Sequence, residues 1–278
     1  MDDSRQRLIR LYLANLRVNT TVVGFNPVMP HWRELDYRPE YNKFYLIVDG
    51  EGWLKIGDRE LYPKPGQLAL MPEGVTQSYS TVGDRYYTKY WCHFTAKVGS
   101  LNLFDLIQPP WLVDTSGDDE PARLFREMLD HSVSDRLSSG LLLQAALLRL
   151  ISYYVERANG AGLRIARSEA GEQLRSVLAY IDEHVRESIT IASMADLIHV
   201  HPNYFIRLFK KHLGVSPIQY VNRKRIEEAK WLLASSDLPL YEIGPRIGIP
   251  DVSYLSKLFK AATGFSPSAY RSMLAVER

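Results

Sequence analysis

The sequence predicts a two-domain α+β protein in which a small β-barrel or sandwich with a helical pair precedes an all-α half. Three observations predict it. Short strand-like runs fill Thr20 to Phe94, helix patterns fill everything from Gln173 onward, and the helical half contains an internal repeat. The length of 278 residues agrees with about two domains, at roughly 100 to 200 residues each.

The composition excludes several classes of protein. Hydrophobic residues make up 46% and charged residues 24% of the chain, which excludes disordered and collagen-like chains. A single cysteine, Cys92, excludes a disulfide scaffold. The first residues are charged, and the longest apolar run, Leu141 to Leu150, contains Gln144 and Arg149, so neither a signal peptide nor a membrane partner is expected. We therefore expect a soluble cytoplasmic protein.

The strands are predicted from short apolar runs between turn residues. Phe44 to Val48, Gly52 to Ile56 and Leu68 to Met71 are rich in β-branched, aromatic and leucine side chains. Gly and Pro residues, such as Asp49-Gly50 and Pro65-Gly66, separate them. Strands this short and this close together are typical of a small barrel or a sandwich.

Two leucine-rich helices are predicted within residues 121–157, because apolar residues recur there at spacings of three and four. They can pack on the outside of the barrel or form the seam of a homodimer, and the sequence leaves both open. Asn159-Gly160-Ala161-Gly162 then begins a segment without an apolar stripe, which indicates a linker. The predicted organisation is an N-terminal domain at 1–118, the helical pair at 119–158, the linker at 159–171 and a C-terminal domain at 172–278.

The C-terminal domain contains a repeat at an offset of 50 residues. The repeat superposes Tyr204 on Tyr254, Leu208-Phe209-Lys210 on Leu258-Phe259-Lys260, Gly214 on Gly264, Ser216-Pro217 on Ser266-Pro267, and Tyr220 on Tyr270. Each Gly is placed to end a helix in a left-handed conformation, and each Ser-Pro is placed to begin the next helix. The repeat predicts two helix-turn-helix units, joined by a helix from Ile218 to Ala234 of roughly 25 Å.

The middle helix of each unit offers polar side chains on its outer face. Phe205, Leu208 and Phe209 can pack inside the first unit, while basic, amide and hydroxyl groups point outward in both. The outward residues are Asn203, Ile206, Arg207 and Lys210, and in the second unit Ser253, Ser256, Lys257 and Lys260. Such a face can contact the edges of bases in the DNA major groove, whereas a single unit of this kind is equally consistent with a solvated amphipathic helix. The duplication favours DNA binding.

A series of spaced residues in the second unit resembles a known family. The residues are Glu242-Ile243, Gly248-Ile249, Ser253-Tyr254-Leu255, Leu258-Phe259-Lys260, Gly264-Phe265-Ser266-Pro267 and Tyr270-Arg271. They are similar to the Glu-Ile-Ala, Gly-Phe, Ser-Tyr-Phe, Phe-Lys, Gly-x-x-Pro and Tyr-Arg series of the DNA-binding domain of AraC/XylS transcription regulators of bacteria. The resemblance covers about residues 172–276.

The resemblance implies two recognition helices that contact double-stranded DNA. The implied base contacts are Asn203, Ile206, Arg207, Val252, Ser253, Ser256 and Lys257. Lys210 and Lys260, with the helix starts at Ser216 and Ser266, are the implied phosphate contacts. The resemblance also implies a homodimer, and a contact with RNA polymerase if the protein is an activator.

The chain departs from the family pattern at several positions. The family usually has Ala at position 244 and Phe at position 249, and no proline at position 245, where this chain has Gly244, Ile249 and Pro245. A proline inside a helix can cost about 3 kcal/mol, so we expect a kinked or shortened helix there. His201 stands where Ser is usual, which predicts a weaker helix cap.

The β-rich half resembles the cupin-like effector-binding domain found in the same family. Metal-dependent cupin enzymes carry a His-x-His pair and a further histidine where Gln77 stands, and this half contains only His31 and His93. We therefore expect no metal, no cofactor and no enzymatic activity. By similarity to the arabinose-type sensor domain, the expected effector contacts are Asn26, Arg38, Tyr79, Lys89 and Trp91, and a sugar suits this mixture of aromatic and hydrogen-bonding groups.

The sequence therefore predicts a sequence-specific transcription regulator that responds to a small molecule. The alternative is a non-metal cupin-like binding protein whose helical tail does not contact DNA. A third hypothesis is a DNA-binding protein without a ligand, whose barrel serves only to dimerise.

Overall fold

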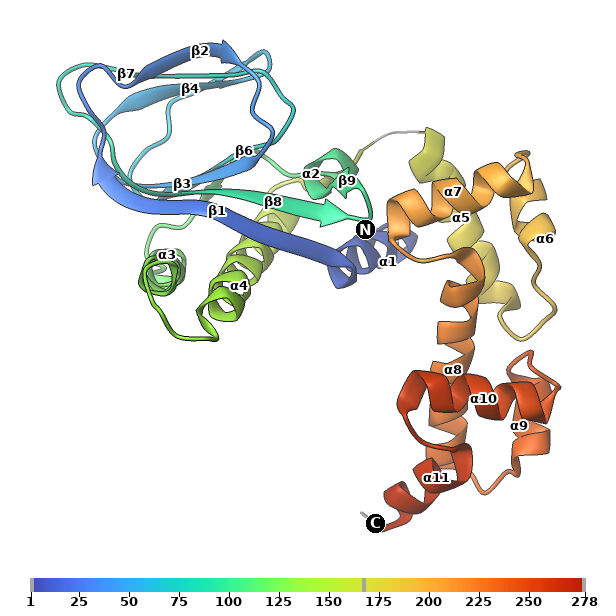
Figure 1. Ribbon diagram of the computed structural model, residues 1–278. Coiled ribbons are helices and arrows are strands. Elements are labelled where there is room, and N and C mark those ends of the chain that lie inside the picture. The colour runs from blue at the N-terminus through green and yellow to red at the C-terminus, as the bar shows by residue number, and fades with distance from the viewer. Residues whose placement is uncertain (1–2, 167–168, 277–278) are drawn as a thin grey trace. The chain divides into compact units, whose positions relative to one another are not determined.

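The computed structural model describes residues 3–166 and 169–276 (Figure 1). The chain forms two compact units. Tyr12–Ala166 form one, and the residues up to Leu11 join the C-terminal part of the chain in the other. The boundary after Ala166 lies inside the segment 159–171 that the sequence indicates as a linker. No helix in the described ranges combines the length and apolar character needed to cross a bilayer.

The β-rich unit consists of two facing antiparallel sheets, in agreement with the predicted cupin-like β fold (Figure 1). The larger sheet has the order β1-β8-β3-β6-β11, with β9 beside β8, and the smaller has the order β2-β7-β4-β5. Their bounds are β1 Leu16–Pro27, β2 Arg33–Tyr37, β3 Asn42–Asp49, β4 Gly52–Ile56, β5 Arg59–Leu61, β6 Gln67–Met71, β7 Gln77–Thr81, β8 Thr88–Val98, β9 Leu101–Asn102 and β11 Leu112–Asp114. The strands predicted from the sequence are β3, β4 and β6.

The two faces of β8 have different roles because side chains alternate along a strand. Cys92 and Phe94 are fully buried on the face that the helices cover, where Phe44 stacks on Phe94 and contacts Tyr154. Lys89, Trp91 and His93 occupy the alternate positions. The larger sheet thus turns one face to the helices and the other to the smaller sheet.

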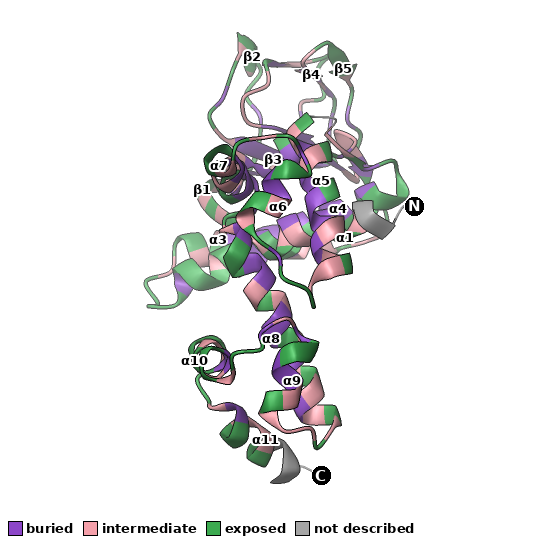
Figure 2. Cartoon of the chain, turned by 90° about the vertical axis from the view of Figure 1, so that its right-hand side faces the viewer, coloured by how far each residue is buried: buried purple, intermediate pink, exposed green. Residues whose placement is uncertain are grey.

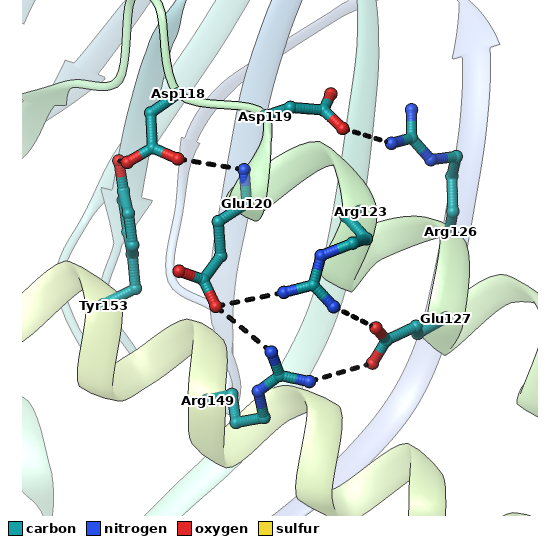
Figure 3. Close-up of polar contacts among 8 residues, drawn as sticks. All are labelled: Asp118, Asp119, Glu120, Arg123, Arg126, Glu127, Arg149 and Tyr153. Atoms are coloured by element: carbon teal, nitrogen blue, oxygen red, sulfur yellow. Dashed lines mark hydrogen bonds and ion pairs between the residues drawn. The ribbon is translucent and has the colours of Figure 1, made fainter.

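The helical pair packs on the larger sheet. The helices of this unit are α2 Leu103–Leu106, α3 Glu120–Ser132 and α4 Ser139–Gly160. Glu120 and Glu127 of α3 accept hydrogen bonds from both Arg123 and Arg149, so two carboxylates and two guanidinium groups form a ring between α3 and α4 (Figure 3). These side chains are one-third to one-half exposed, so each pair contributes at most about 1 kcal/mol.

Part of the expected linker is regular structure. Helix α4 extends to Gly160, and β12 Arg164–Ile165 pairs with β10 Ile107–Gln108. Leu163 is buried, which holds the segment between them against its own unit. The glycines at positions 160 and 162 therefore lie where α4 turns toward β12, and residues 159–171 do not form a flexible linker throughout.

The C-terminal unit is entirely helical. Its helices are α1 Asp3–Ala14, of which the residues up to Leu11 lie in this unit, α5 Glu169–His184, α6 Ile191–Asp196, α7 Pro202–Leu213, α8 Pro217–Ser235, α9 Leu240–Arg246, α10 Val252–Thr263 and α11 Pro267–Val276. The position of α1 differs from the predicted domain boundaries, which placed all of residues 1–118 in the N-terminal domain. Leu8 is 1% exposed and lies beside Leu178 of α5, and Arg7 forms an ion pair with Asp182.

The helix ends follow the repeat. Gly214 and Gly264 end α7 and α10 in the left-handed conformation, with φ of 75° and 83°, as the sequence predicts. Ser216 accepts a hydrogen bond from the Gln219 amide of α8, and the Gln219 side chain accepts one from the Ser216 amide. At His201, where a weaker cap is predicted, a side-chain cap is present, because the ring nitrogen Nδ1 accepts a hydrogen bond from the Asn203 amide at 3.2 Å.

Of the kinked or shortened helix expected at Gly244 and Pro245, the shortening is not observed. Helix α9 has seven residues, one more than its counterpart α6. Pro245 lies in the last turn of α9, so the carbonyl left without a backbone donor is that of Tyr241, a residue that is 65% exposed and can bind water. The proline is tolerated because it falls at the helix end.

Helix α8 connects the two helix-turn-helix units and is mostly buried or intermediate along its length (Figure 2). Arg225 of α8 is 8% exposed and donates hydrogen bonds to the carbonyl oxygens of Val185 and Glu187, at 2.9 and 2.5 Å. A Cβ built on Gly248, which follows α9, would lie 2.9 Å from the Arg225 guanidinium. Arg225 therefore contacts both the end of α5 and the second helix-turn-helix unit.

Candidate DNA interface and effector cavity

The recognition helices α7 and α10 present the outer faces that the sequence predicts. Phe205 and Phe209 of α7, and Leu255 and Phe259 of α10, are fully buried. The expected base contacts Asn203, Arg207, Ser253 and Lys257 are exposed, while Ile206, Val252 and Ser256 are intermediate. Equivalent positions of the two units thus face outward together.

The cations on these outer faces have no acidic partner in the part of the chain that the structure describes. Within residues 3–166 and 169–276, no ion pair is found for Arg207 and Lys210 of α7 or for Lys257 and Lys260 of α10. By contrast, Lys224 of α8 pairs with Asp182. A helix whose cations lack carboxylate partners can form its ion pairs with the phosphates of a nucleic acid.

The two expected phosphate sites at helix starts differ. The amide of Ser216 is already hydrogen-bonded to Gln219. The counterpart of Gln219 in the second helix-turn-helix unit is Ala269, which has no side-chain acceptor. Ser266 Oγ accepts a hydrogen bond from the Ala269 amide and so caps α11. No partner for the Ser266 amide is found in the described part of the chain. The backbone amide of Ser266 is therefore available to donate a hydrogen bond to a phosphate, whereas that of Ser216 already donates to Gln219.

A cavity of about 430 Å³ lies between the two sheets of the N-terminal unit. Its volume is within the range of small-molecule sites, roughly 300 to 1,000 Å³. It is lined by Asn26, Val28, Met29, His31, Trp32, Arg33, Tyr45, Tyr79, Lys89, Trp91 and His93. Four of the five expected effector contacts, Asn26, Tyr79, Lys89 and Trp91, are therefore brought together.

Arg38 is the expected contact that does not line the cavity. It is exposed and donates a hydrogen bond from Nε to the carbonyl oxygen of Gly74, while the Gly74 amide donates to Pro39 at 2.9 Å. Arg38 thus closes the turn at Gly74. The sequence resemblance placed it in the binding site because it shows the order of the turns but not the direction of the side chain.

A glycine positions the Trp91 ring at the wall of the cavity. Gly24 of β1 pairs with Trp91 of β8, and a Cβ on Gly24 would lie 2.5 Å from two atoms of the ring. The indole Nε1 donates a hydrogen bond to Asn26 Oδ1 at 2.7 Å. The absence of a side chain at position 24 lets the ring lie against the sheet, and Asn26 fixes its orientation.

Several cavity residues were missed by sequence reasoning. Trp32 stacks on Tyr79 with a centroid distance of 4.4 Å, and Tyr45 and His93 complete the aromatic wall. Their strands are joined by long-range pairing, so local sequence carries little signal for their proximity. Lys43 could have been recognised from the sequence, because a lysine at the start of an apolar strand is unusual in a buried sheet.

Burial dominates the electrostatics of this cavity. It lowers the pKa of Lys89 to about 8. It also lowers the pKa of Lys43 to about 7, against an opposing effect of Glu34 and with a further lowering by Lys89. Burial, with repulsion from both lysines, lowers the pKa of His93 to about 4, so the imidazole is neutral at pH 7.

The position expected for a cupin metal ligand is occupied by an amide. Gln77 is buried and donates a hydrogen bond to the Pro72 carbonyl at 2.6 Å. Among the described residues, no group of three or more His, Cys, Asp or Glu side chains could hold a metal ion.

Comparisons with known proteins agree with both halves of this description. A model of the AraC-like ligand-binding domain matches residues 38–151, and a model of a helix-turn-helix domain matches residues 194–273. An uncharacterised helix-turn-helix transcriptional regulator of Bacillus subtilis, YisR, is 30% identical over 261 residues, which are 84% of this chain and 87% of the relative. The chain belongs to the AraC family of transcription regulators.

Other relatives of this AraC-family regulator extend the comparison. The arabinose operon regulatory protein of Escherichia coli is 25% identical over 263 residues, covering 90% of this chain and 89% of that protein. The C-terminal domain of AraT, a response regulator from Geobacillus stearothermophilus, is 37% identical, with a TM-score of 0.35 over 36% of this chain and 84% of that chain. As a member of this family, the protein is a DNA-binding transcription regulator with a ligand-binding domain and not an enzyme.

Proposed function

We propose that this AraC-family regulator binds a carbohydrate or a carbohydrate derivative in the cavity lined by Trp91, and that it acts on DNA as a homodimer. The observation that carries the proposal is the Trp91 ring held over Gly24. A flat indole face accommodates the C–H face of a sugar ring, while Asn26 and Tyr79 supply hydrogen-bonding groups for hydroxyls. The name of the arabinose operon relative supports this class of ligand.

The effector proposal is tested by thermal melting of the full chain against a panel of neutral and charged sugars. The variant Gly24→Ala displaces the Trp91 ring and is expected to abolish the shift in melting temperature that a bound sugar causes. Gly140→Ala is the matched control, because a Cβ on Gly140 meets no atom within 4 Å. If no sugar of the panel shifts the melting temperature, the effector proposal is contradicted. The N-terminal domain would then serve only to dimerise the protein.

We propose that both recognition helices contact bases. Asn203, Arg207, Ser253 and Lys257 are the exposed candidates, with Ile206, Val252 and Ser256 beside them, and Lys210, Lys260 and Ser266 contact phosphates. Selection of bound duplexes from a randomised library at two salt concentrations tests this. Two enriched elements about one helical turn apart are expected, whereas a single element would contradict the engagement of both helices.

We propose that the outer face of α4 forms the homodimer seam. Leu141 and Leu148, seven residues apart, are 71% and 41% exposed, and Ala145 lies between them on the same face. Helix α4 has 22 residues, or about 33 Å at ~1.5 Å per residue, which is long enough for a paired helix. An identical α4 is the occupant that suits this stripe, because the two copies would bury their leucines against each other.

A further inference from the structure

Two buried lysines, Lys89 in the wall of the effector cavity and Lys43 behind it, form no ion pair among the described residues. Lys43 is 1% and Lys89 is 4% exposed. Neither ammonium group has a hydrogen bond or an ion pair within residues 3–166 and 169–276. Buried lysines are rare unless they are paired, because removing an ammonium group from water is costly. Two of them close together, one lining the cavity and one behind its wall, therefore need an explanation.

The aromatic rings around the lysines attract the cations without satisfying their donors. Lys89 Nζ lies 4.6 Å from the ring centre of Trp32 and 4.7 Å from that of Tyr45. Lys43 Nζ lies 4.3 Å from the ring centre of Tyr37 and 5.3 Å from that of Tyr79. Each ammonium carries three N–H donors, and a ring face supplies no lone pair equal to a carboxylate oxygen.

Lys89 lines the cavity, and Lys43 lies behind two of its lining residues, His93 and Tyr79. Lys89 lines it directly, together with Tyr45, Tyr79 and His93. Lys43 is paired with His93 in the register of β3 and β8, and it contacts Tyr79. The buried hydroxyl of Tyr37, beneath Lys43, also has no partner among the described residues. The Lys89 ammonium in the cavity wall, and the Lys43 ammonium and Tyr37 hydroxyl behind it, are therefore donors without an acceptor among the described residues.

The other charged groups do not neutralise the pair. Arg33 and His31 line the same cavity and add no negative charge, and His93 is neutral at pH 7 because burial lowers its pKa. Glu34 is the acid that influences Lys43, but its carboxylate is exposed and accepts a hydrogen bond from the Tyr79 hydroxyl at 2.8 Å. The charges that face the cavity thus sum to a positive excess.

We infer that the effector carries an anionic group, a carboxylate or a phosphate, that binds Lys89 and is supported by Lys43. This inference rests on the proposed effector site and specifies its ligand class. The hydroxylated part of the ligand lies against Trp91 and Asn26, and the anionic group reaches the Lys89 ammonium, with Lys43 adding positive charge behind it. A hydroxylated acid or a sugar phosphate has this combination, whereas a neutral sugar leaves both lysines unsatisfied.

The test compares three probes of similar shape on the full chain: D-glucose, D-gluconate and D-glucose 6-phosphate, with acetate and inorganic phosphate as fragment probes. Binding is measured by melting temperature and by calorimetry. At least one class of anion is expected to bind at least tenfold more tightly than glucose, because hydrogen bonds between an ammonium group and an anion are stronger than those between neutral groups. D-gluconate carries a carboxylate and D-glucose 6-phosphate carries a phosphate, so these two probes show which anionic group the site binds.

The variant Lys89→Met keeps the length of the side chain and removes its charge, and Lys43→Met does the same behind it. Each is expected to lose at least tenfold in affinity for the anion, and Lys64→Met, at an exposed position outside this cavity, none. Calorimetry in two buffers at pH 8.5 gives a second signature. Anion binding restores the charged form of Lys89, so proton uptake is expected, and a neutral ligand produces none.

The outcomes separate this inference from the proposed function. If glucose or another neutral sugar binds as well as the anions and Lys89→Met leaves that binding unchanged, the carbohydrate proposal stands and the anionic effector is rejected. If none of the four anions shifts the melting temperature at millimolar concentration, the anionic effector is likewise rejected. Lys89→Met is expected to melt at or above the wild-type temperature, so loss of binding is not explained by unfolding.

Discussion

The backbones of Gly244 and Ile249 are in direct contact. A Cβ on Gly244 would lie 2.4 Å from the carbonyl oxygen of Ile249, and the Ile249 amide donates a hydrogen bond to the Gly244 carbonyl at 2.8 Å. Glycine at this position lets the turn before α10 close tightly on α9. The departure from the family pattern at position 244 thus has a steric reason in this chain.

Gly244→Ala is expected to destabilise the second helix-turn-helix unit by about 1 to 3 kcal/mol, because backbone atoms must move to admit the methyl group. Amide hydrogen exchange of Leu240–Arg246 measures the effect. Gly140→Ala, where space is open, should be neutral or stabilising by up to about 1 kcal/mol. Equal protection of α9 in the wild type and Gly244→Ala would show that the turn relaxes freely.

Arg225→Lys is expected to weaken the link between the two helix-turn-helix units. A lysine cannot donate in the forked geometry that serves the carbonyls of Val185 and Glu187. The loss of these charged hydrogen bonds should cost about 1.5 to 3 kcal/mol in urea unfolding. The control is Arg223→Lys, at an exposed position of the same helix, and a similar loss there would contradict a specific role for Arg225.

Arg207→Ala is expected to cost about 1 to 3 kcal/mol on the selected duplex and little on random DNA, if Arg207 contacts a base. Lys257→Ala should behave in the same way at the second element. Lys210→Ala should weaken binding to both duplexes and lower the salt dependence. Titrations at two salt concentrations distinguish these results, and an equal loss on both duplexes would make Arg207 a phosphate contact.

The stability of the ligand-free protein is expected to rise between pH 7 and pH 8.5. Burial lowers the pKa of Lys43 to about 7 and that of Lys89 to about 8, from 10.5. In this window the unfolded chain binds more protons than the native protein, so the free energy of unfolding increases with pH. Above this window Cys92 acts in the opposite direction, because burial raises the pKa of its thiol above the ordinary value of 9.0, so the unfolded chain loses this proton first.

The variant Lys89→Met should flatten this pH dependence, which chemical denaturation at several pH values measures. Lys64→Met is the control and should reproduce the wild-type slope. An unchanged slope in Lys89→Met would mean that Lys89 stays charged in the native protein.

Leu148→Glu is expected to convert the proposed homodimer to a monomer, because the like charges of two copies would meet at the seam. Light scattering at several protein concentrations measures the mass. Leu35→Glu, an exposed leucine on β2, should leave the mass unchanged. A wild type that is monomeric at micromolar concentration would contradict the dimer.

The sequence predicts the two helix-turn-helix motifs of the C-terminal unit in detail because their signals are local. Gly214 and Gly264 end helices, Ser216 begins one, and the apolar spacing of Phe205 and Phe209 gives the buried face. Each of these depends on residues within one or two turns of helix. The repeat then supplies the same information twice.

The cavity was only partly predictable because it depends on pairing between distant strands. Trp32 and Tyr79 stack although they are far apart in the sequence. In β3 both faces are buried from Asn42 to Ile47, so the period of two is hidden and the sequence does not show which face Lys43 occupies. The direction of Arg38 was equally inaccessible, because a turn motif does not determine where a long side chain points.

The place of α1 affects how the protein is made. Leu8 leaves the ribosome 170 residues before Leu178 (178 minus 8), an interval of about 10 to 30 s at roughly 5 to 20 residues per second. Throughout that time, its partner in the C-terminal unit does not yet exist. A fragment that begins at α5 therefore exposes apolar surface to solvent, and an affinity tag at the amino terminus is attached to the DNA-binding unit rather than to the effector domain.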